Sequence, residues 1–154
     1  MDIKTLKNMI CEIVMGANDL KNTYTDEVKA SVNYVCIFAQ TQKEYDDMIK
    51  IMHQFGTIVQ ETANWPLFRI SPLTTIAWHL VLCKIRIHDI TRPERGDADF
   101  TVSDYDSFKN KYLQQECFTL ISREKFEMIE LYDPSANYRA YFSNIPLTTQ
   151  LGVV

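Results

Sequence analysis

Two pairs of charged residues are the part of this sequence best suited to chemistry. Asp97 and Asp99 lie two residues apart, as do Lys84 and Arg86, and both pairs fall in segments with the alternation of a strand. Because successive side chains of a strand point to opposite faces, each pair shares one face. Two neighbouring carboxylates could share a proton, with the pKa of one of them raised. Two cations on an otherwise apolar strand could hold an anionic ligand in a cavity.

Both pairs also have purely structural interpretations. Asp97 and Asp99 could flank a turn and cap backbone groups, Lys84 and Arg86 could face solvent, or the two pairs could neutralise each other. Asp99 is the better candidate for a catalytic role, because it lies further into an apolar segment.

The remaining motifs exclude several classes of enzyme. His53, His79 and His88 do not have the spacing of a metal motif such as His-Glu-x-x-His. With four glycines the chain has no phosphate-binding loop or dinucleotide fingerprint, and it lacks a Gly-x-Ser-x-Gly elbow. Tyr141 adds aromatic surface that could line a pocket.

Composition indicates one globular domain. The 154 residues are 46% hydrophobic and 23% charged, with a net charge of −4 and interspersed signs, which disfavours nucleic-acid binding. Charges interrupt the first residues, and no later stretch is apolar for long enough to cross a bilayer, so no membrane contact is expected. The four cysteines are widely spaced without a Cys-x-x-Cys pair. We therefore expect reduced, buried thiols and a cytoplasmic protein.

Hydrophobic periodicity predicts the elements that position the charged pairs. Apolar residues at helical spacing between Ile3 and Val14 predict an N-terminal helix that ends at Gly16, with a second short helical piece over 26–29. A period of two then predicts a strand over 32–38. A helix follows from the capping box Thr41-x-x-Glu44 to Gly56, and strands follow over 57–61, 66–70 and 79–87.

The second half of the chain repeats this order. After a turn at 92–96, the pattern predicts a strand over 97–102, a helix that begins at Ser103-x-x-Asp106, and strands over 117–122, 127–132 and 138–143. The sequence thus predicts a single α+β domain over 1–154. A helical extension over 1–30 precedes two tandem βαβββ modules, 31–90 and 91–145, and a tail covers 146–154.

These paired modules resemble the vicinal oxygen chelate superfamily, the glyoxalase and bleomycin-resistance fold. The turn at 133–137, Asp-Pro-Ser-Ala-Asn, is similar to the family's Asp-Pro-Asp-Gly-Asn turn before its last strand. The resemblance covers roughly 31–144 and is greatest to functionally uncharacterised bacterial members with an N-terminal helical extension. It implies two modules that curl one mixed sheet around a shared cavity.

The resemblance also implies where a metal would bind. Family enzymes place ligands, usually His and Glu, on the first and last strands of each module. Those positions here are Asn33, Asp99, Ala140 and either Cys83 or Lys84. Ala140 has no donor atom, and two oxygens from Asn33 and Asp99 make a poor transition-metal site. A shift of one residue would turn each side chain to the other face, and it yields no His-plus-carboxylate set either. No cofactor is therefore expected.

The leading hypothesis is a metal-free protein that binds a small, anionic organic molecule in the cavity between its modules. The expected ligand contacts are Asn33, Lys84, Arg86, Asp99 and Tyr141. Two alternatives stay open: a metal-dependent lyase, isomerase or dioxygenase of the same superfamily, and a non-catalytic module whose N-terminal helix or sheet edge binds another protein. A homodimer also stays open.

Overall fold

The computed structural model describes residues 1–61 and 65–153, which form four helices and eight strands. The first module and its extension contain α1 (Ile3–Tyr24), β1 (Ser31–Phe38), α2 (Gln42–Met52), β2 (Gly56–Gln60), β3 (Leu67–Thr75) and β4 (Trp78–Arg86). The second module and the tail contain β5 (Gly96–Thr101), α3 (Tyr105–Tyr112), β6 (Phe118–Ser122), β7 (Glu127–Leu131), β8 (Tyr138–Ser143) and α4 (Leu147–Gln150). Among the described helices, none has the length and apolar character needed to cross a membrane.

All eight strands belong to one mixed sheet in the order β2-β3-β4-β1-β5-β8-β7-β6. Within each module the first strand pairs in parallel with the last, β1 with β4 and β5 with β8. The modules join where β1 and β5 pair in antiparallel. The structure therefore confirms the predicted α+β fold of two βαβββ modules behind an N-terminal helix.

The N-terminal helix continues past Gly16, where the sequence predicted its end. Helix α1 runs to Tyr24, and residues 26–29 form a turn instead of a second helix. A Cβ atom at position 16 would overlap the aromatic ring of Tyr138. The glycine thus lets α1 approach β8 closely and does not stop the helix.

We predict that Gly16→Ala destabilises the protein by about 2 kcal/mol, since the added methyl group overpacks the contact with Tyr138. At an exposed position inside a helix, the same change would stabilise by about 1 kcal/mol. Urea unfolding of Gly16→Ala measures the sign directly. Glu12→Ala, an exposed position on α1, is the control and should change stability by less than about 0.5 kcal/mol. A Gly16→Ala variant more stable than the wild type would contradict the close contact.

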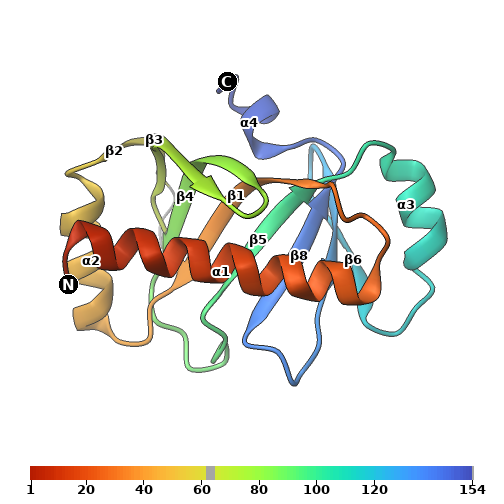
Figure 1. Ribbon diagram of the computed structural model, residues 1–154, viewed down its shortest axis with the longest axis horizontal. Coiled ribbons are helices and arrows are strands. Elements are labelled where there is room, and N and C mark those ends of the chain that lie inside the picture. Colours follow the sequence, from red (N-terminus) through yellow and green to blue (C-terminus); the bar gives the residue numbers. More distant parts are fainter. Residues whose placement is uncertain (62–64, 154) are drawn as a thin grey trace.

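Local caps begin the two module helices. The Thr41 hydroxyl accepts a hydrogen bond from the Glu44 amide at 3.0 Å, as the capping box predicts. In the second module Asp104 caps α3 by accepting from the Ser107 amide at 3.0 Å, so the prediction of Ser103 as the start was one residue early. Helix α1 lies across the sheet, with α2 and α3 toward its two ends (Figure 1).

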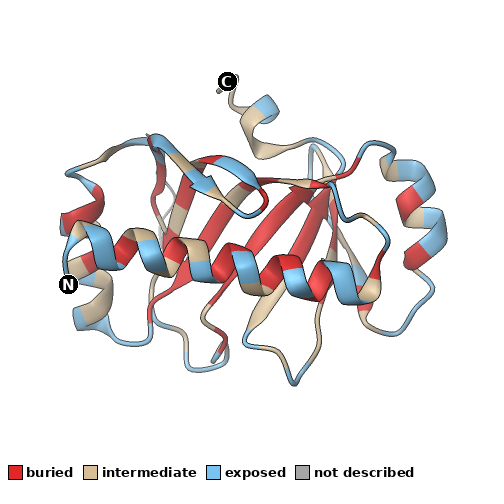
Figure 2. Cartoon of the chain, in the orientation of Figure 1, coloured by how far each residue is buried: buried red, intermediate tan, exposed pale blue. Residues whose placement is uncertain are grey.

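The face of the sheet under α1 is apolar, which places the charged residues on the other face. Gly96 lies against Ile13 of α1, and the Lys21 ammonium is 5.3 Å from the centre of the Phe100 ring. Gly96, Ala98 and Phe100 of β5 are all buried, and Figure 2 shows the central strands beneath α1 as largely buried. Since side chains alternate, Asp97 and Asp99 face away from α1.

The four cysteines form no disulfide in this structure, and the prediction that all of them are buried holds for two. Cys36 and Cys83 are buried, whereas Cys11 and Cys117 are only half-buried, because they lie near the margins of the packed core.

Candidate functional site

A cavity of about 200 Å³ opens on the sheet face away from α1, where the two modules meet. Its floor is a row of side chains across three strands, since Cys36 of β1 is the register partner of both Lys84 on β4 and Asp97 on β5. Register partners share a face of the sheet, so Lys84 and Asp97 flank the small Cys36 side chain. The remaining lining residues are Tyr34, Phe38, Trp65, Arg86, Arg92, Arg123, Met128 and Tyr141.

Cationic side chains dominate this pocket. Arg86 pairs with Asp89 at 3.1 Å, and its guanidinium carbon lies 5.1 Å from the Trp65 ring centre and 5.2 Å from that of Phe38. Within residues 1–61 and 65–153, the other three cations of the lining, Lys84, Arg92 and Arg123, form no ion pair. Asp89 neutralises Arg86, so three cations remain unpaired. When Asp97 is ionised it offsets one of them, and the pocket carries an excess of two positive charges.

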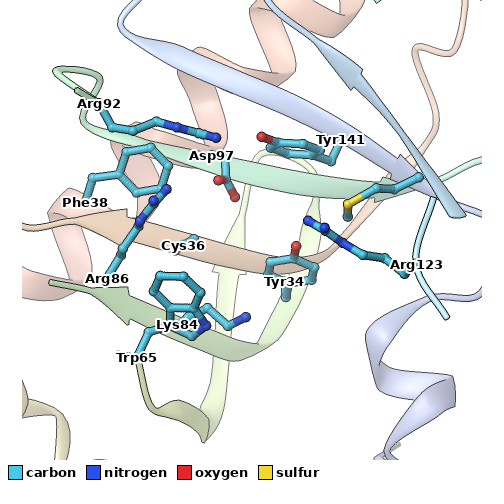
Figure 3. Close-up of a pocket in the computed structure, with 11 residues that line it drawn as sticks. Tyr34, Cys36, Phe38, Trp65, Lys84, Arg86, Arg92, Asp97, Arg123 and Tyr141 are labelled. Atoms are coloured by element: carbon cyan, nitrogen blue, oxygen red, sulfur yellow. The ribbon is translucent and has the colours of Figure 1, made fainter. Parts of the chain in front are cut away.

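Asp97 supplies the carboxylate of the lining, and it is unpaired. Its side chain is 7% exposed, and its Oδ1 atom is buried without a hydrogen bond from any residue the structure describes. Burial raises its pKa to about 7, against the opposing effect of Lys84. Figure 3 shows this carboxylate beside Arg92 and Tyr141, with Cys36 between it and Lys84. No ion pair joins Asp97 to Lys84 or Arg86 within the described residues, although the charge of Lys84 opposes the rise in the Asp97 pKa.

Asp99, two residues along the same strand, is fully hydrogen-bonded. It accepts from the Asn33 amide at 2.9 Å, from the Ser143 backbone amide at 3.3 Å and from the Ser143 hydroxyl. A bulge between Val32 and Tyr34 breaks the register of β1 at Asn33. The side-chain oxygen Oδ1 of Asn33 accepts a hydrogen bond from the backbone amide of Leu147 in α4 at 3.4 Å.

Asn33 and Asp99 therefore form a buried polar cluster that ties β1, β5, β8 and α4 together. Neither lies among the residues that line the pocket. Burial raises the pKa of Asp99 to about 6, while the hydrogen bonds from Ser143 and Asn33 oppose that rise. The sequence ranked Asp99 above Asp97, but the geometry favours Asp97 for contact with a ligand.

Tyr141 lines the pocket, and a residue outside the lining, Glu130, holds its hydroxyl in place. The hydroxyl donates to Glu130, which also accepts from Arg139 at 3.2 Å. Burial, Asp97 and Glu130 raise the Tyr141 pKa, so the phenol stays neutral at physiological pH. Its neighbour Ala140 pairs in register with Ala98 and lies on the opposite, helix-covered face. The last-strand ligand position implied by the resemblance, Ala140, thus faces away from the pocket, and its neighbour Tyr141 faces into it.

The pocket's donor set does not fit a divalent metal. Nowhere in the described ranges do three or more His, Cys, Asp or Glu side chains gather in a way that could hold one. Beside Asp97 stand Lys84, Arg86 and Arg92, whose charges repel a cation. None of His53, His79 and His88 lines the pocket.

Sequence reasoning did not find Arg92, Arg123 and Tyr34 as lining residues. Arg92 and Arg123 lie in connections between strands, where no periodicity assigns a direction to a side chain. Tyr34 could have been found from the two-residue period, because residues 34, 36 and 38 of β1 lie on the same face of the strand.

No protein-family model matches the sequence, and no curated protein is similar to it. Among solved structures, a structural-genomics protein named EC4020 is similar in fold, with a TM-score of 0.70 and 9% identity over 93% of this chain and 87% of that one. A glyoxalase/bleomycin resistance protein/dioxygenase superfamily member from Vibrio splendidus 12B01 gives a TM-score of 0.45 and 8% identity over 74% of this chain and 97% of that one. A mutant 4-hydroxymandelate synthase from Streptomyces coelicolor gives a TM-score of 0.33 and 11% identity, over 80% of this chain and 51% of that one.

At 9% identity, the similarity to EC4020 concerns the fold alone. The two βαβββ modules, joined in one mixed sheet, agree with the arrangement that the sequence resemblance implied. Function must be argued from the pocket itself.

Proposed function

We propose that this protein binds a small organic dianion in the cavity between its two modules. The observation that carries the proposal is the excess of two positive charges in a pocket where Lys84, Arg92 and Arg123 have no acidic partner within the described part of the chain. A ligand with two acid groups would neutralise that excess. Guanidinium groups suit such a ligand, because they bind carboxylates through two parallel hydrogen bonds.

The size and rigidity of the pocket support a small ligand. Its volume of about 200 Å³ is below the range of about 300–1,000 Å³ that is typical of sites for drug-sized molecules. Arg86 is held between the rings of Trp65 and Phe38 and by Asp89, so its guanidinium loses little freedom when a ligand arrives.

The two alternatives have less support. The lining lacks a donor set for the metal that a superfamily lyase, isomerase or dioxygenase would use. Helix α1 buries Leu6, Ile10 and Ile13 completely against the sheet, so its apolar stripe is occupied within the chain. The free thiols support a cytoplasmic location, where cysteines stay reduced.

We predict that succinate, a probe for this charge pattern, binds the wild type and that Lys84→Gln weakens its binding about tenfold, because one charge-assisted contact is lost. Isothermal titration calorimetry measures both affinities. Binding should also weaken as salt is raised, since screening reduces the attraction of half-exposed cations.

Lys125→Gln is the matched control, an exposed lysine in the loop after β6 and outside the pocket lining. It should leave succinate affinity unchanged. Equal losses in the two variants would mean that the protein attracts anions only through its overall charge. An absence of succinate binding to the wild type would remove the proposal.

A further inference from the structure

A pocket that bound only anionic groups would gain nothing from a carboxylate at its floor. Asp97 nevertheless lies there, more than nine-tenths buried, and its buried Oδ1 atom accepts no hydrogen bond from the described residues. Burying an unpaired carboxylate is costly, because desolvation is not repaid by hydrogen bonds. Asp99 shows that the same strand can satisfy a buried carboxylate fully when its role is structural.

The unpaired carboxylate therefore suits a hydrogen-bond donor on the ligand. The donor group could be an ammonium or a hydroxyl. Four cations already line the pocket, and a fifth positive charge would be repelled by Lys84, Arg86 and Arg92. A hydroxyl donates a hydrogen bond without adding charge.

The row across the floor positions such a ligand. Lys84 and Asp97 are both register partners of Cys36, so they are two strand spacings apart, roughly 10 Å between backbones. The small Cys36 side chain leaves space between them. An acid group can therefore meet Lys84 while a hydroxyl a few atoms away meets Asp97.

We propose that the ligand is a small hydroxylated dicarboxylic acid, whose hydroxyl donates to Asp97 while its carboxylates contact Lys84 and the neighbouring arginines. This inference rests on the proposed binding of a dianion and adds the group that discriminates among dianions.

The test compares malate with succinate, which lacks only the hydroxyl. Calorimetric titration of the wild type should show malate binding at least about tenfold more tightly than succinate, as expected for a hydrogen bond to a charged acceptor. In Asp97→Ala, which removes the acceptor, this preference should fall below about threefold, and succinate should bind more tightly than to the wild type because a repelling charge is gone. Asp97→Asn keeps a neutral acceptor and should retain an intermediate preference.

Asp99→Asn is the matched control, two residues along the same strand but outside the pocket lining, and it should keep the full preference for malate. Equal binding of both acids to the wild type would overturn the role of the hydroxyl while leaving dianion binding intact. A preference for malate that survives in Asp97→Ala would overturn Asp97 as its partner. If neither acid binds any of the four proteins, the proposed function itself fails.

Discussion

Asp97→Asn is expected to stabilise the protein at pH 8 by about 3 to 4 kcal/mol. The pKa of Asp97 rises from its ordinary value of 3.8 to about 7, first because the carboxyl is buried. A tenfold change in an equilibrium constant corresponds to about 1.4 kcal/mol, so holding this group ionised in the folded state is costly. The amide of asparagine has almost the same shape and carries no charge.

The sign of the pH dependence follows from the direction of that shift. Because the folded protein binds this proton more tightly than the unfolded chain, the stabilising contribution is complete below about pH 3.8 and is lost as the pH rises through about 7. The advantage of Asp97→Asn should therefore be near zero at pH 4 and grow to its full value by pH 8. Chemical denaturation at several pH values measures the difference between variant and wild type.

Lys125→Gln, an exposed change of the same size in net charge, serves as the control and should show no such growth. A variant less stable than the wild type at pH 8 would show that Asp97 has a partner in the folded state. The expected gain in stability of Asp97→Asn accompanies an expected weakening of its preference for malate, which is the trade-off typical of a residue kept for binding.

The fold was predictable because its signals are local. Strand alternation gave β8 with the bounds 138–143 that the structure has, and the Thr41 cap begins α2 as expected. Gly16 misled the prediction because its role depends on Tyr138, which lies far along the chain. A glycine that permits a close contact cannot be told from a helix stop without that neighbour.

The pocket was only partly predictable, since its composition depends on register. Lys84, Arg86 and Tyr141 do line the cavity, as the alternation suggested. Asp97 and Asp99 share a face and cannot be distinguished by period. What separates them is Ser143, which the pairing of β8 with β5 brings to Asp99 and not to Asp97.

The bulge at Asn33 could likewise not be predicted from the sequence, because a bulged strand contains the same types of residue as a regular one. The bulge adds the Asn33 amide to the donors around Asp99. A polar cluster thus adds to the apolar packing of Phe100 and Phe142 in this part of the sheet, and its members should be intolerant of truncation.

Asp99→Ala is expected to destabilise the protein by about 3 kcal/mol, in contrast to Asp97→Ala, which removes a carboxylate whose buried Oδ1 atom accepts no hydrogen bond from the described residues. The change leaves the Ser143 amide and hydroxyl without their acceptor in a buried site, and it takes one of two acceptors from Asn33. Each unsatisfied buried group costs about 1 to 3 kcal/mol, and relief from burying a charge offsets part of that sum. Denaturant unfolding at pH 7 measures the loss.

Asp99→Asn separates the hydrogen bonds from the charge. Its carbonyl oxygen can accept from Asn33 and from the Ser143 amide, and its NH₂ group can donate to the Ser143 hydroxyl oxygen, which rotates to accept. We therefore expect Asp99→Asn to be at least as stable as the wild type at pH 8. Asp99 is ionised at this pH, and its pKa of about 6 means that folding disfavours the ionised form, a cost that the neutral asparagine does not have. Equal stability of Asp99→Ala and Asp99→Asn would contradict the structural role of the cluster, since that role requires an acceptor and not a charge.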